Sequence, residues 1–99
     1  RRPEMGVISI RCKATGEAFL GASKDTRADF NSNRAKLSMG SHPNKRLAAL
    51  WEQYGEEGFE WLVLKTLDYE NPGDDHTAEL EKLREQCLDE DEKAVKIWK

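Results

Sequence analysis

Apolar and polar residues alternate at the start of the chain, over residues 6–12. The apolar face carries Ile8, Ile10 and Cys12, and the polar face carries Ser9 and Arg11. A period of two is typical of a β-strand. Residues 13–16 have the composition of a turn and end in a glycine, which tolerates positive φ. Because residues 17–22 again resemble a strand, the pattern predicts an antiparallel hairpin.

The period becomes helical after this hairpin. Residues 24–39 have apolar residues at helical spacing, and Gly40 follows as a helix stop. A second helix is predicted from Pro43, whose missing N–H is harmless in a first turn, with Ser41 or His42 as its cap. Its apolar stripe consists of Leu47, Leu50, Trp51 and Tyr54, and Gly55 ends it.

The second half of the chain predicts one strand and two helices. Residues 58–65 are aromatic and β-branched in a nearly continuous run, which predicts a central strand buried on both faces. After a break at residues 71–73, a third long helix is predicted over 77–89 and a short terminal helix over 91–99. The order β-β-α-α-β-α predicts an α+β fold, with helices around a small three-stranded antiparallel sheet, in a single domain over residues 1–99.

The composition, with 37% hydrophobic and 35% charged residues, fits a soluble globular protein. Because no apolar stretch approaches 18 residues, we expect neither a membrane span nor a signal peptide. The first residue is Arg1 rather than methionine, so an upstream extension of the native chain stays open. Cys12 and Cys87 match no metal-binding spacing, and we expect them to be free buried thiols.

The net charge of −3 conceals a strong asymmetry. Residues 1–50 carry ten Lys and Arg against four Asp and Glu, whereas residues 51–99 carry six against fifteen. This division indicates a basic face for an anionic partner beside an acidic remainder. The alternative is ordinary solvated surface, and it stays open because the two halves can interleave in the fold.

Several short segments are similar to those of one nuclease family. They are Gly6-Val7-Ile8, Phe19-Leu20-Gly21, Gly40-Ser41-His42-Pro43-Asn44-Lys45, Leu47, Trp51 and Tyr54-Gly55-Glu56-Glu57-Gly58-Phe59-Glu60. With these segments in this order, the chain resembles the GIY-YIG endonuclease superfamily over roughly residues 6–90. The resemblance implies that family's fold, and DNA as a partner.

The same resemblance implies positions for the family's chemistry. In active members a tyrosine in each motif positions the attacking water. An arginine and a histidine one turn apart on the first helix support the phosphate, and a glutamate on the third long helix binds a divalent metal. The corresponding residues here are Ile8, Phe19, Asp29, Asn33 and Arg84. They lack both hydroxyls, reverse the charge beside the phosphate and place a cation at the metal ligand, so the resemblance implies a degenerate site.

Two of these positions have exchanged charge signs. Asp29 stands where the family has an arginine, and Arg84 stands where it has a glutamate. Since the family's pair faces each other across the cleft, one expectation is a salt bridge between them. The alternative is that both are unrelated surface charges.

Three functions remain open from the sequence. The first is a catalytically inactive module that binds DNA or assists DNA processing, needing no cofactor. Its phosphate contacts would come from Arg27, Arg34, Lys36, Lys45 and Arg46. The second is a Mg²⁺- or Mn²⁺-dependent endonuclease with relocated groups Glu85, His42 and Arg27, although His42 is also a candidate turn residue. The third is a protein–protein module using the acidic half and Trp98. Small family members from bacteria, often near mobile elements, suggest by analogy a bacterial cytoplasmic protein.

Overall fold

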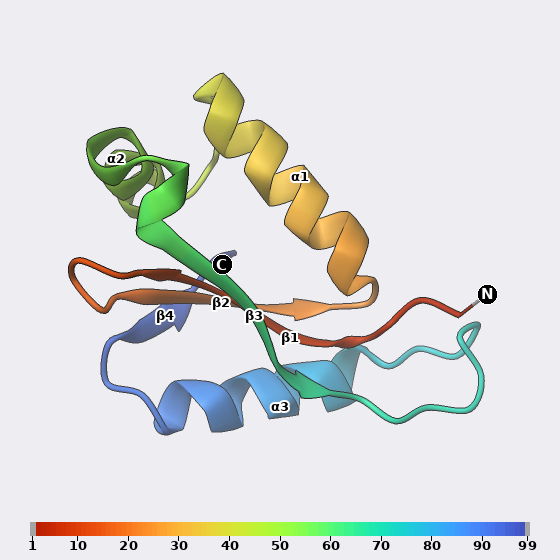
Figure 1. The fold of residues 1–99 in the computed structure, drawn as a ribbon. Coiled ribbons are helices and arrows are strands. Elements are labelled where there is room, and N and C mark those ends of the chain that lie inside the picture. The colour runs from red at the N-terminus through yellow and green to blue at the C-terminus, as the bar shows by residue number, and fades with distance from the viewer. Residues whose placement is uncertain (1, 99) are drawn as a thin grey trace.

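The computed structural model describes residues 2–98 as a sheet between two layers of helices (Figure 1). Its elements are β1 (Gly6–Cys12), β2 (Ala18–Ser23), α1 (Thr26–Met39), α2 (Lys45–Tyr54), the short 3-10 helix η1 (Glu56–Gly58), β3 (Phe59–Thr66), α3 (Thr77–Asp89) and β4 (Ala94–Lys96). The predicted α+β class is confirmed. Helices α1 and α2 cover one face of the sheet, and α3 covers the other. In the part of the chain that is described, no helix combines the length and apolar character needed to cross a membrane.

The predicted hairpin of β1 and β2 is present and divides the core into two layers. Gly16 adopts a φ of 78° in its turn, as the sequence predicts. The residues of β1 predicted to share a face, together with Phe19, lie in the cluster under α1 and α2. Val7 and Leu20 lie in the cluster under α3. Cys12 and Cys87 are free and buried, one in each layer.

The position predicted for the third strand is wrong. The sheet order is β3-β1-β2-β4, so β1 is the central strand and β3 lies at an edge. One face of β3 packs under α1 and α2, whereas Leu62 and Leu64 are 48% and 39% exposed. Because α3 packs mainly on β1 and β2, it leaves this part of the edge strand uncovered. An apolar run alone therefore does not distinguish a central strand from an edge strand.

The predicted terminal helix over residues 91–99 is also wrong, and the sheet has four strands rather than three. Asp91 instead begins a turn, in which its Oδ1 accepts the Lys93 N–H at 2.9 Å. The chain then enters β4, which pairs parallel to β2. Ile97 N–H donates to the Leu20 carbonyl oxygen at 2.9 Å. This pairing satisfies the open edge of β2, which a two-turn helix could not do. Lys99 lies outside the described residues.

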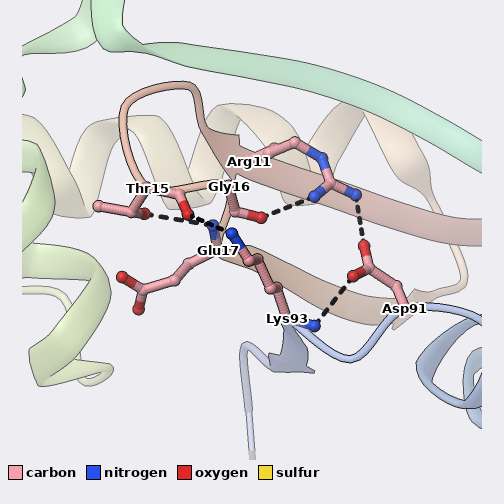
Figure 2. Close-up of polar contacts among 6 residues, drawn as sticks. All are labelled: Arg11, Thr15, Gly16, Glu17, Asp91 and Lys93. Atoms are coloured by element: carbon pink, nitrogen blue, oxygen red, sulfur yellow. Dashed lines mark hydrogen bonds and ion pairs between the residues drawn. The ribbon is translucent and has the colours of Figure 1, made fainter.

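A cluster of polar contacts fixes the C-terminal segment to the hairpin (Figure 2). Arg11 donates to the Gly16 carbonyl oxygen at 2.7 Å and to Asp91 Oδ2 at 2.6 Å. Lys93 Nζ donates to the Thr15 carbonyl oxygen at 3.2 Å. The hydrogen bond from Arg11 holds the pKa of the Asp91 carboxyl below its usual range. The two bonds to Asp91 and from Lys93 join residues 80 and 78 positions apart in the sequence, and they position the segment that leads into β4.

Both helices over the first face end as predicted, but α2 begins differently. Gly40 is the C-cap of α1 with a φ of 73°, and Gly55 follows α2. The N-cap of α2 is Asn44, not Ser41 or His42, because the Asn44 Oδ1 accepts the Leu47 N–H at 3.0 Å. Pro43 accordingly precedes the helix rather than occupying its first turn.

Candidate nucleic-acid interface

The two positions that correspond to the family's tyrosines are closed to solvent. Ile8 and Phe19 are wholly buried in the layer under α1 and α2. Neither side chain carries a hydroxyl group, and no part of either reaches the surface. These positions therefore supply packing to the fold rather than a proton acceptor or a water-positioning group.

Trp98 covers the second motif strand. A Cβ on residue 21 would lie 2.4 Å from Cζ3 of Trp98 and 3.0 Å from Cη2 of the same ring. Such separations are far below van der Waals contact. A side chain at residue 21 would therefore displace the Trp98 indole from β2. The motif alone does not reveal this contact.

The positions of the family's arginine and histidine belong to a hydrogen-bonded chain. The Asp29 carboxylate accepts from Ser23 Oγ, and its carbonyl oxygen accepts from Asn33 Nδ2 at 2.7 Å. Asn33 Oδ1 lies 2.6 Å from Nε2 of the buried His42. The Asn44 N–H donates to His42 Nδ1 at 3.0 Å, so Nε2 carries the proton and donates to Asn33. These bonds give His42 the role of a turn residue joining α1 to α2.

The two histidines have opposite protonation preferences. Burial, and then the nearby Lys36, lower the pKa of His42. His76 instead has acceptors on both ring nitrogens, with the Asn71 carbonyl oxygen at 2.8 Å from Nε2 and Glu79 Oε1 at 2.9 Å from Nδ1. These two acceptors, the Asn71 carbonyl first, raise the pKa of His76. The fold therefore favours neutral His42 and protonated His76.

Opposite pH dependences of stability are expected for the two positions. With its folded pKa lowered, His42 contributes stability that is present above its unfolded pKa of about 6.5 and is lost as the pH falls below that value. With its folded pKa raised, His76 contributes stability that is present below about 6.5 and is lost as the pH rises through the folded pKa. The free energy of unfolding of His76→Gln should therefore fall on acidification, and that of His42→Gln should fall as the pH rises. Urea denaturation across this range checks the signs, and slopes of the same sign would contradict them.

The expected salt bridge between Asp29 and Arg84 is wrong. Within residues 2–98 no ion pair joins them, because α1 and α3 lie on opposite faces of the sheet (Figure 1). The Arg84 guanidinium instead lies 3.6 Å from Glu85 on its own helix. The Arg84 Nε is buried without a hydrogen bond. An alignment of this sequence with the family's motifs therefore does not show on which face of the sheet each aligned residue lies.

The residues present do not fit the divalent metal that the family implies. The position of its carboxylate ligand is held by the cation Arg84, and the neighbouring Glu85 is largely exposed. Between Arg2 and Trp98 no group of three His, Cys, Asp or Glu side chains gathers closely enough to hold an ion. The proposed relocated groups are also separated, since Glu85 is on α3 whereas His42 and Arg27 lie on the opposite side of the sheet.

The charge asymmetry of the sequence is an asymmetry between the two faces of the sheet. Residues 26–54, which form α1 and α2, carry five cations against two acids. Residues 67–92, which include α3 and its flanking loops, carry two cations against eleven acids. These two segments lie on opposite sides of the sheet (Figure 1), although the strands of the two halves do interleave within it, in the order β3-β1-β2-β4. The face formed by α1 and α2 is therefore the basic face.

All five cations predicted to contact nucleic acid lie on the basic face, but they differ in availability. Arg46 forms a bidentate pair with Glu17, at 2.9 Å and 2.7 Å. Arg34 lies 3.3 Å from Glu56 and stacks on an aromatic ring. The described part of the chain contains no ion pair to the remaining three, Arg27, Lys36 and Lys45.

Comparison with solved structures identifies the architecture as GIY-YIG-like, the fold of a class of nuclease catalytic domains, and confirms the resemblance in fold. One match is the catalytic domain of the homing endonuclease I-TevI, with a TM-score of 0.72 and 19% identity over 87% of this chain and 86% of that one. A mutant of the same domain, described as an intron endonuclease, matches with a TM-score of 0.72 and 18% identity, over 88% and 82% of the two chains. Comparisons with protein-family models and with curated protein sequences gave no match. The shared feature is the fold.

Proposed function

We propose that this chain is a catalytically inactive GIY-YIG-like module that binds DNA through phosphate contacts on its basic face. The observation that carries the proposal is the segregation of cations onto α1 and α2, on a scaffold shared with an endonuclease catalytic domain. Phosphate contacts of this kind give affinity and orientation without reading sequence. Such a domain would act as an accessory in DNA processing.

The absence of catalysis is supported by what occupies the family's positions. Ile8 and Phe19 are buried and have no hydroxyl, and Asn33 is engaged with His42. Asp29 places a negative charge where hydrolysis needs a cation beside the phosphate. Since the metal-binding carboxylate is replaced as well, each role in phosphodiester hydrolysis lacks its group.

DNA binding is expected to depend on Lys36 but not on Lys82. Both lysines are exposed on helices, Lys36 on the basic face and Lys82 on α3, so alanine makes the same change in net charge at each. Lys36→Ala should weaken duplex binding and lower the slope of log K against log salt by about 1. Lys82→Ala should change neither quantity. Fluorescence anisotropy between about 50 and 200 mM salt measures both, and no binding at the lower salt concentration would end the DNA proposal in favour of a protein–protein module.

A plasmid-nicking assay tests the inactivity. With Mg²⁺ or Mn²⁺ and a high protein concentration, the supercoiled plasmid should stay intact. Nicking that disappears in Glu85→Ala would establish the alternative, a metal-dependent endonuclease with relocated groups.

A further inference from the structure

A groove of about 360 Å³ lies between α1 and β3 on the basic face. Its lining includes two cations, one amide, one carboxylate and two aromatic rings. These are Arg27, Arg34, Asn31, Glu4, Trp61 and Phe30. The positions of the family's catalytic groups contribute nothing to this lining, so the groove is separate from the degenerate site. Its volume is within the range of small-ligand sites.

The groove contains a rigid stacking surface. Trp61 is held edge-on by Phe30, with ring centroids 5.8 Å apart, and by Trp51 at 6.0 Å. The Arg34 guanidinium lies over the Trp61 ring at 4.7 Å from its centroid. A guanidinium fixed on an indole is a preorganised platform for a nucleobase, because bases stack on arginine planes as well as on aromatic rings. The Arg34 side chain is 42% exposed, so a ligand can reach it.

The Arg34 charge is available to an incoming ligand. Its partner Glu56 is 61% exposed at a distance of 3.3 Å, and an exposed pair of this kind contributes little. The Nε of Arg34, which faces Glu56, is buried and makes no hydrogen bond within the described residues. A nucleotide that enters the groove can therefore displace the Glu56 carboxylate without breaking a strong interaction.

The remaining groups suit the edge and the phosphate of a nucleotide. Arg27, Asn31 and Arg34 follow one another at helical spacing, so they line one stripe of α1. The Asn31 amide can both donate to and accept from a base edge. The Glu4 carboxylate, which accepts from Thr26 Oγ1 at 2.8 Å, can also accept from a base amino group. A paired base in duplex DNA exposes neither its stacking face nor its pairing edge.

We propose that the groove between α1 and β3 binds one unpaired nucleotide of a DNA strand, with its base on the Arg34–Trp61 stack and its phosphate beside Arg27. This inference rests on the proposed DNA binding and adds a preference to it. Duplexes with an overhang and single strands are bound more tightly than fully paired DNA. The basic face holds the backbone of the flanking DNA, and the groove supplies the additional stacking contact.

The experiment compares a blunt labelled duplex with the same duplex carrying a single-stranded overhang, using the full chain and fluorescence anisotropy. The overhang should raise the affinity at least about fivefold, the effect of one stacked base. Arg34→Lys keeps the charge but loses the planar stack, so it should abolish this preference. Asn31→Ala should reduce the preference, whereas the control Lys36→Ala should weaken both DNAs equally.

The possible failures are distinguishable. Equal affinity of the native chain for the two DNAs overturns the groove proposal and leaves the proposed function standing. Retention of the full preference in Arg34→Lys overturns the groove proposal too. A competition experiment gives a further test: if a glutamate-rich peptide displaces the labelled overhang DNA as effectively as the unlabelled strand does, the groove recognises negative charge rather than a base, and the proposal is overturned. Lack of binding to either DNA removes the proposed function itself.

Discussion

Gly6→Ala is expected to destabilise the protein by about 3 kcal/mol or more, at the upper end of overpacking effects. A Cβ on residue 6 would lie 2.1 Å from the Lys65 carbonyl oxygen and 3.0 Å from the Thr66 Cα. Both atoms belong to the backbone of β3 where it pairs with β1. Neither atom can move away as a flexible side chain could, so the substitution must open the ladder between the two strands.

Gly40→Ala is the matched control. Its Cβ would meet nothing within 4 Å, but residue 40 has a φ of 73°. Alanine there should cost only about 1–2 kcal/mol of backbone strain. Gly6 is not among the glycines with positive φ, so its effect is steric alone. The free energies of unfolding from urea denaturation compare the two variants, and a Gly6→Ala loss no larger than that of Gly40→Ala would contradict the steric account.

Restoring the family's tyrosines is expected to damage the fold rather than create activity. Phe19→Tyr would place a hydroxyl in an apolar cluster that is closed to water, at a cost of about 1–3 kcal/mol. Ile8→Tyr would also force a larger ring into a wholly buried position of β1 and should be worse. The double variant should unfold at a lower urea concentration and leave supercoiled plasmid intact.

Phe30→Tyr provides the control for the hydroxyl group. Phe30 is only partly buried, at the margin of the same cluster, so its hydroxyl can reach water. The free energy of unfolding of Phe30→Tyr should stay within about 0.5 kcal/mol of that of the native protein. A double variant of Ile8 and Phe19 that remained stable and nicked DNA with Mg²⁺ would show that only the hydroxyls had been missing.

The sequence predicts correctly those strands and helices whose apolar residues repeat along one side of the element. The alternation in β1 and the stripe of α2 lead directly to buried residues such as Ile10 and Leu47. The edge position of β3 could not be read, because an apolar run is the same whether a helix covers its second face or not. β4 left a weak signal, the alternation of Val95, Lys96 and Ile97, but three residues form a strand only because β2 offers a partner.

The sequence predicts which cations belong to the candidate nucleic-acid interface, but it does not predict the contacts that their side chains make. The sequence predicts Arg27 and Lys36 on the first long helix, and both lie on α1, one of the two helices of the basic face. The ion pair of Asp29 with Arg84 failed because sequence order does not give the face of the sheet. The stacking of Arg34 on Trp61, from elements far apart in the chain, has no local signal at all.

The parallel pairing of β2 with β4 has a consequence for biosynthesis. Residues 18–20 pair with residues 94–96, so the sheet cannot be completed until almost the whole of this sequence has left the ribosome. The hairpin, α1, α2 and β3 can assemble earlier, since their contacts are closer in sequence. Until β4 arrives, the nascent chain carries β2 as an unpaired edge, with its backbone groups available to other strands. Chains that stop before residue 94 should therefore be prone to aggregation even though every helix is intact.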